Sequence, residues 1–183
     1  MTYVELIVVL SIFSTMTSVV LFNYGGFQAK VDIKNLASDI ALKVVEAQRA
    51  SLSGTLPSQA TTPTWKPSYG IYFDITAPKQ FIYFVDLNNA NGYETTEAVS
   101  TIDITKNNYI QGIQRCSGDT CVPASPISPL AIIFQRPDSR AVFKDSNGVT
   151  LTNDFDYIEI SIQSPESATS TIKVYPSGRI QVN

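Results

Sequence analysis

Few residues in this chain have types and spacings that support chemistry, and histidine is absent from all 183 positions. Without an imidazole group, Ser-His-Asp and Cys-His nucleophiles, His-ligated zinc sites and histidine pH switches are excluded. The sequence also has no Walker loop, GxGxxG turn or GxSxG elbow, and no carboxylate pair or nucleophile beside a base. The net charge of -3 offers no overall attraction for nucleic acid, although local patches can differ. We therefore expect a protein without enzymatic activity, cofactor or bound metal.

Glu5 is a carboxylate near the start of a long apolar run. Residues 3–22 read YVELIVVLSIFSTMTSVVLF, and no side chain from Leu6 to Ala29 is charged. As a helix, twenty residues rise about 30 Å, which is the thickness of a bilayer's hydrocarbon core. The run lacks the basic start and the small cleavage-site residues of a signal peptide. We therefore expect it to span the membrane once.

Glu5 is expected to have a partner, because a carboxylate inside a bilayer costs on the order of 3 kcal/mol on insertion scales. The nearest lysine is Lys30, which leaves an α-amino group as the available cation. Met1 lies about one helical turn from Glu5, so a neighbouring copy shifted along the helix axis would place its Met1 amine beside Glu5. This hypothesis implies staggered self-assembly. The alternative is an ordinary membrane anchor in which Glu5 has no such role.

The helical pattern continues beyond the apolar run. From Lys30 onward, charged residues alternate with an apolar and small face formed by Ile33, Leu36, Ala37, Ile40, Val44, Ala47 and Ser51. This spacing predicts an amphipathic helix that lies on a globular head and projects the apolar run beyond it. Gly54 and Pro57 are expected to end the helix. Two adjacent glycines each cost roughly 1 kcal/mol relative to alanine, so we predict a kink or local unwinding at Gly25 and Gly26.

The remainder of the chain has the pattern of a β-rich head. Short β-branched and aromatic runs predict strands at residues 69–74, 80–85, 98–104, 109–113, 130–135, 141–144, 157–163, 171–175 and 179–182. The first two runs and the last two are each expected to form a hairpin. Apolar and polar residues alternate at 158–162, which indicates an antiparallel sheet with one solvated face. The predicted fold is α+β, with a hydrophobic transmembrane helix at residues 1–28, its amphipathic half at 29–55 and the head at 56–183.

The N-terminal residues resemble those of a known family. MTYVELIVVLSIFS is similar to the mature start of type IV pilins and type II secretion pseudopilins, with Thr2 and Glu5 at the expected places. EAQRAS at residues 46–51 is similar to the end of their long helix, and YGIYFD, FVDLNNANGYETTE and YPSGRIQV resemble the heads of GspH-like and FimT-like members. The resemblance covers the helix well and the head loosely. Ser14 and Phe22 stand where many pilins have Gly and Pro, which again favours unwinding at the glycine pair.

The resemblance implies the pilin fold and a structural role. A prepilin peptidase would cleave ahead of Met1 and methylate its amine, and Glu5 would pair with the amine of a neighbouring subunit. The chain would lie in the cytoplasmic membrane before assembly and then in a cell-surface filament built by the pilus assembly machinery. We expect the major pilin, a helical homopolymer of this chain. The alternatives are a minor pilin or secretion pseudopilin and, from another class, a membrane-anchored binding ectodomain.

Cys116 and Cys121 enclose a short glycine-containing turn, CSGDTC. Because the resemblance places the head in a disulfide-permissive compartment outside the cytoplasmic membrane, we expect the two cysteines to be oxidised to a disulfide. Closing so short a loop contributes about 2 kcal/mol. The alternative is a metal or redox pair, although two thiols without histidine do not complete a structural zinc site.

Asp86 and Glu97 bracket a loop rich in acids and amides, as in oxygen-ligand calcium sites. In an EF-hand loop the fifth position would be an acid or amide and the sixth a glycine, whereas Ala90 and Asn91 stand there and Gly92 follows one position late. Asn-Gly clusters are also typical of plain turns. Calcium binding at this loop therefore stays open.

Overall fold

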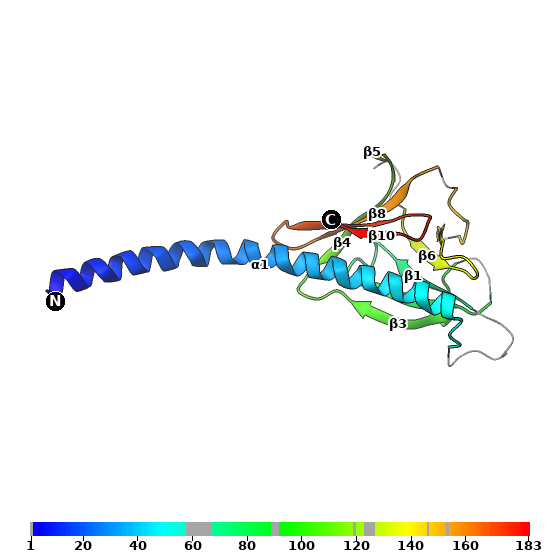
Figure 1. The fold of residues 1–183 in the computed structure, drawn as a ribbon, viewed down its shortest axis with the longest axis horizontal. Helices are drawn as coiled ribbons and strands as arrows, with labels where there is room; N and C mark the ends of the chain where they lie inside the picture. Colours follow the sequence, from blue (N-terminus) through cyan, green and yellow to red (C-terminus); the bar gives the residue numbers. More distant parts are fainter. Residues whose placement is uncertain are drawn as a thin grey trace.

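The structure is a computed structural model that describes residues 2–57, 67–88, 92–118, 120–122, 127–145, 147–152 and 154–183, with Phe22 and Asn23 described by their backbone alone. One long N-terminal helix, α1 (Tyr3–Ser53), packs by its second half on a head of antiparallel sheets. Its first half projects from the head as a rod, so the two ends of the chain are far apart (Figure 1). The α+β prediction is confirmed.

Sheet A has the strand order β3-β2-β1-β6-β7 and is antiparallel throughout. Its strands are β1 (Ser68–Phe73), β2 (Gln80–Asp86), β3 (Ala98–Asp103), β6 (Leu130–Phe134) and β7 (Ala141–Lys144), and the short 3-10 helix η1 (Thr95–Glu97) precedes β3. The predicted hairpin between the first two strands is confirmed, with Phe73 paired with Phe81. Gly70 lies where a Cβ would be 2.6 Å from the Ile132 carbonyl oxygen and 2.7 Å from the Phe84 ring, so no larger residue fits without movement.

Sheet B has the strand order β10-β9-β8-β4-β5. Its strands are β4 (Tyr109–Ser117), β5 (Thr120–Val122), β8 (Tyr157–Gln163), β9 (Thr169–Val174) and β10 (Ile180–Val182). The C-terminal hairpin of β9 and β10 is confirmed. The alternation at 158–162 is also confirmed, because Ile158, Ile160 and Ile162 are buried while Glu159 and Ser161 are half-buried. The sequence patterns did not predict β5, nor that the strands divide into two sheets.

Helix α1 begins and ends at residues with capping chemistry. Thr2 is the N-cap, and its hydroxyl accepts the Glu5 N–H. Gly54 ends the helix in the left-handed conformation, with φ of 65°, and its N–H bonds to the carbonyls of Ala50 and Ser51. Left-handed backbone costs glycine little, which is why it commonly terminates helices. The predicted end of the helix at Gly54 is confirmed.

The helix runs without interruption through Gly25 and Gly26, so the local unwinding predicted there is wrong. Figure 1 shows a gentle curve along α1. Glycine lowers helix propensity by roughly 1 kcal/mol, but unlike proline it keeps its N–H and removes no hydrogen bond from the helix. The turns that follow are held on the head, which supports helical geometry from one side. Gly25 also lies close to the head, since an added Cβ would be 3.7 Å from Glu166 Oε1.

The second half of α1 docks through the face that the sequence predicted. The buried residues of this face are Ile33, Ala37, Ile40, Ala41, Val44, Ala47 and Ser51, with Leu36 half-buried beside them. They pack against β1 and β6 of sheet A and against β8, β9 and β10 of sheet B. The Ser51 hydroxyl donates to the Phe134 carbonyl (2.7 Å), and Gln48 Nε2 donates to the carbonyls of Ser139 (2.8 Å) and Gly178 (3.1 Å). The helix therefore joins both sheets into one core.

Candidate assembly surface and helix–head junction

The first half of α1 is an exposed apolar surface. Every described side chain from Thr2 to Phe27 is exposed, including Tyr3 at 80%, Phe13 at 68% and Leu21 at 69%. Within the described chain this helix is the one element long and apolar enough to cross a membrane, a property that a membrane anchor and a signal sequence share. Monomeric soluble proteins rarely expose contiguous apolar patches of more than a few hundred Å². The surface therefore requires lipid or other protein around it.

The hydroxyl groups on this surface bond to the helix itself. Ser11 donates to the Val8 carbonyl, Thr15 to the Ile12 carbonyl and Thr17 to the Phe13 carbonyl, each at 2.8 Å. A hydroxyl placed in an apolar medium without a partner costs several kcal/mol. With these bonds made, the polar atoms of the three side chains are compatible with lipid or with the apolar side chains of a neighbouring helix.

Glu5 has a hydrogen-bond partner at the start of its own helix, in addition to the neighbouring amine that the sequence predicts. Its Oε2 accepts the Thr2 N–H at 3.0 Å, while the Glu5 N–H bonds to the Thr2 hydroxyl at 3.4 Å. This is a capping box, in which the side chains of the N-cap and third helical residues satisfy two N–H groups at the start of a helix. The Thr-x-x-Glu spacing was visible in the sequence. Met1 lies outside the described residues, so the position of its amine stays a prediction.

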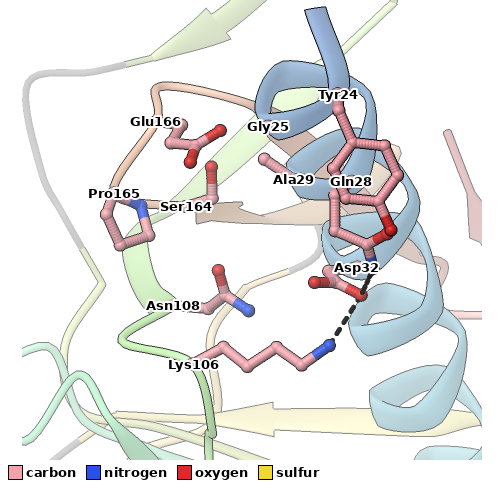
Figure 2. Close-up of a pocket in the computed structure, with 10 residues that line it drawn as sticks. All are labelled: Tyr24, Gly25, Gln28, Ala29, Asp32, Lys106, Asn108, Ser164, Pro165 and Glu166. Carbon is pink, nitrogen blue, oxygen red and sulfur yellow. Dashed lines mark hydrogen bonds and ion pairs between the residues drawn. The ribbon is translucent and has the colours of Figure 1, made fainter. Parts of the chain in front are cut away.

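A cleft lies where α1 meets the head. It has a volume of about 280 Å³ and is lined by Tyr24, Gly25, Gln28, Ala29, Asp32, Lys106, Asn108, Ser164, Pro165 and Glu166. Figure 2 shows the helix residues on one wall and the turns after β3 and β8 on the other. No sequence motif indicated this site, because its residues come from three segments that are far apart in the chain.

An ion pair closes one end of the cleft. Lys106 Nζ lies 2.7 Å from Asp32 Oδ1, which also accepts a hydrogen bond from Gln28 Nε2 at 3.0 Å. The hydrogen bond from Lys106 holds the pKa of the Asp32 carboxyl below its usual value. Lys106 and Asn107 both have positive φ values, 59° and 57°, and the Asn107 side chain accepts a hydrogen bond from Lys79 at 3.1 Å. The pair ties the β3–β4 turn to α1.

The remaining polar side chains that line the cleft are those of Tyr24, Asn108, Ser164 and Glu166. Asn108 lines the cleft and is only 4% exposed. Figure 2 shows its side-chain amide pointing into the space between α1 and Ser164. Glu166 is exposed at the far rim, and Ser164 is buried with its hydroxyl accepting the Ala168 N–H.

The two cysteines form the predicted disulfide. Cys116 in β4 pairs directly with Cys121 in β5, and their sulfurs are bonded. Glu159 lies close to both sulfurs, which makes these three residues the one cluster of possible metal-binding side chains among those that the structure describes. Metal ligation by cysteine requires the thiolate, and these sulfurs are bonded to each other. The disulfide stiffens the β4–β5 hairpin at the edge of sheet B.

Glu97, at the end of the loop that begins at Asp86, has a structural role. Glu97 is 1% exposed, and its oxygens accept the N–H groups of Leu87 (2.9 Å) and Glu94 (3.1 Å). Both carboxylate oxygens therefore hold the loop and η1 in place. Residues 89–91, which include two of the candidate calcium positions, lie outside the described residues.

Comparison of the chain with protein-family models, with curated proteins and with solved structures found no match. Function is therefore inferred from the chain's own sequence and structure. A long N-terminal helix, half exposed and half docked on an antiparallel head with a disulfide, has a shape compatible with a pilin-like structural subunit.

Proposed function

We propose that this chain is a structural subunit, present in many copies, of a cell-surface filament similar to a type IV pilus, and that it acts by assembly rather than by catalysis. The observation that carries the proposal is the exposed apolar half of α1, which adjoins a head with a well-buried core of its own strands and the docked half of the helix. Its N-terminal sequence, with Thr2 and Glu5, adds the resemblance to pilins.

The size of the exposed surface explains why this half of the helix needs lipid or other protein around it. Burying one Val, Leu, Ile or Phe side chain stabilises a protein by about 1.5–3 kcal/mol. The exposed large apolar residues of this half are Tyr3, Val4, Leu6, Ile7, Val8, Val9, Leu10, Ile12, Phe13, Met16, Val19, Val20, Leu21, Tyr24 and Phe27. Lipid would cover them before assembly, when residues 3–22 span the cytoplasmic membrane. Neighbouring copies would cover them in the filament.

Glu5 sets the register in this proposal. In a chain processed by prepilin peptidase to begin at Met1, the methylated amine of one subunit pairs with Glu5 of its neighbour. A buried charge without a partner is costly, so registers that leave Glu5 alone are disfavoured. The capping box supports this role, because it holds the carboxylate at the helix start through Oε2, while Oε1 accepts no hydrogen bond from the residues that the structure describes.

The test is Glu5→Gln, which removes the charge and keeps an acceptor for the Thr2 N–H. We expect the variant to insert in the membrane at the normal level and to yield few filaments. Glu46→Gln is the matched control, because Glu46 is an exposed carboxylate on the docked half of the same helix. Normal filament yield from the Glu5 variant would refute the proposed role of the charge.

A minor pilin or a secretion pseudopilin is the second candidate, since it would share Glu5 and the same helix. Mass spectrometry of filaments sheared from the native cells distinguishes the two by abundance and reads the mass of the N-terminal peptide. A dominant chain with a methylated Met1 supports the major subunit. Trace amounts support a minor one. Recovery only from the envelope, with an unprocessed N-terminus, supports a membrane-anchored ectodomain, which the length and apolar character of α1 also allow.

A further inference from the structure

The junction between α1 and the head has two flanks of different character. One flank is the cleft of Figure 2, with Glu166 at its rim. On the other, Lys30 and Lys34 border an apolar groove lined by Phe27, Val31 and Ile33 together with residues 167–169. The β8–β9 turn separates the flanks, because Pro165 and Glu166 line the cleft whereas Ser167 and Ala168 line the groove. Both flanks therefore lie at the same level along α1.

The two flanks carry exposed side chains of opposite charge. Lys30, Lys34 and Glu166 are all exposed. Among the described residues, none of the three takes part in an ion pair, whereas Asp32 is paired with Lys106. The cleft flank thus presents one free carboxylate and the groove flank presents two free ammonium groups.

The helix positions show that the flanks are opposed and that Glu5 belongs to the lysine side. At 3.6 residues per turn, Lys30 and Lys34 each lie within about 20° of Glu5 around the helix axis. By the same rule, Gln28 and Asp32 of the cleft are each about 160° from Lys30. One side of α1 therefore carries Glu5, Lys30 and Lys34, and the opposite side carries the cleft.

We propose that the cleft of one copy receives Lys30 of the next copy, with Lys34 beside it. This inference rests on the proposed function and names the surface through which subunits meet above the membrane. The contact joins two different surfaces of the same chain, so it does not close on itself in a dimer. Contacts of this kind generate rings or open helical filaments.

The stagger set by Glu5 brings these groups together. If the Met1 amine of one copy lies at the level of its neighbour's Glu5, each residue of the first copy lies level with the residue four positions later in the neighbour. Lys30 and Lys34 of the neighbour then fall level with positions 26 and 30 of the first copy, inside the span from Gly25 to Asp32 that lines its cleft. The same two copies therefore make both contacts in one register.

The cleft has suitable chemistry for an ammonium group. Lysine offers three N–H donors and no acceptor. Glu166 supplies a carboxylate that is in no ion pair among the described residues, and the Asn108 amide, which also lines the cleft, has an oxygen that can accept a hydrogen bond. In a Glu166→Lys variant, the new ammonium group would lie beside Lys30 of the next copy and repel it. The contact is therefore specific for a carboxylate on the cleft and an ammonium group on the facing copy.

Site-directed cross-linking in native cells tests the contact. The two cysteines of the chain are bonded to each other, so introduced thiols are the only free ones. Cells that express Glu166→Cys and Lys30→Cys chains together are treated with a short bismaleimide, and their sheared filaments are analysed. We expect cross-linked dimers that contain one of each chain. Lys43→Cys in place of Lys30→Cys is the control, because Lys43 lies on another side of the helix, and it should give none.

Charge exchange provides a second readout. Lys30→Glu and Glu166→Lys should each lower filament yield about tenfold, the effect of losing one charge-assisted hydrogen bond, and the two together should restore it. Lys43→Glu should leave the yield unchanged.

The outcomes distinguish this interface from the proposed function. Filaments whose assembly depends on Glu5 but that show neither cross-links nor charge rescue would overturn this interface while leaving the proposed function intact. Loss of membrane retention in Lys30→Glu, without rescue by Glu166→Lys, would overturn it in favour of anionic lipid headgroups. Absence of the wild-type chain from filaments would overturn both proposals.

Discussion

Gly178 holds the turn between β9 and β10 against the end of α1, and its replacement by alanine tests how the helix is fastened to the head. Its φ is 85°, in the left-handed region, and its N–H bonds to the Tyr175 carbonyl at 2.8 Å. A Cβ at this position would overlap the Ser139 carbonyl oxygen and lie 2.5 Å from Gln48 Nε2. The substitution therefore strains the turn and displaces the side chain that links two loops to the helix.

The magnitude follows from these contacts. A left-handed conformation costs an L-residue roughly 1–2 kcal/mol. Displacing Gln48 breaks its hydrogen bonds to Ser139 and Gly178, at about 0.5–1.5 kcal/mol each. The sum is about 3 kcal/mol, which lowers the Tm of a domain of this size by about 6–12 °C.

The assay is thermal unfolding, followed by circular dichroism, of a chain shortened to residues 29–183 so that the exposed apolar half of α1 is absent. Gly112→Ala is the matched control, since an added Cβ there meets nothing within 4 Å. Gln48→Ala measures the hydrogen-bond share separately and should lower the Tm by less than Gly178→Ala does. If Gly178→Ala unfolds at the same temperature as Gly112→Ala, the reasoning about this turn is refuted.

Two further predictions concern the junction and the hairpin. The ion pair with Lys106 lowers the pKa of Asp32, so its contribution to stability is present above the pKa of the unfolded carboxyl, 3.8, and is lost as the pH falls through the lower pKa of the folded state. Urea unfolding of wild type and Lys106→Met should therefore differ at neutral pH and converge in acid, and an equal difference at both would contradict the assignment. Replacing Cys116 and Cys121 by serine together should destabilise the head by about 2 kcal/mol, because the closed loop is short. Reductant should reproduce this loss in the wild-type chain and leave the double variant unchanged, as measured by the urea midpoint.

Much of the fold followed from local patterns. The buried face of α1 was predicted from its helical spacing, and every predicted strand is present, because apolar periodicity reflects which side chains face a core. The end of the helix at Gly54 was predicted from the conformational freedom of glycine. The break at Gly25 and Gly26 was predicted on the same grounds and was wrong. Propensity is a weak preference, and tertiary contacts with the head override it.

The chain's own sequence therefore determined the apolar run, the position of Glu5 within it, the amphipathic half of the helix and the identity of most strands. Each of these depends on residues that are neighbours in the chain. Only the tertiary structure decided that the strands form two sheets, that Gln48 anchors the helix to two loops, and that Asp32 meets Lys106 beside the buried Asn108 and the exposed Glu166. These groups come from segments far apart in the sequence. Their meeting depends on how the helix crosses the head, which no local pattern of side chains encodes.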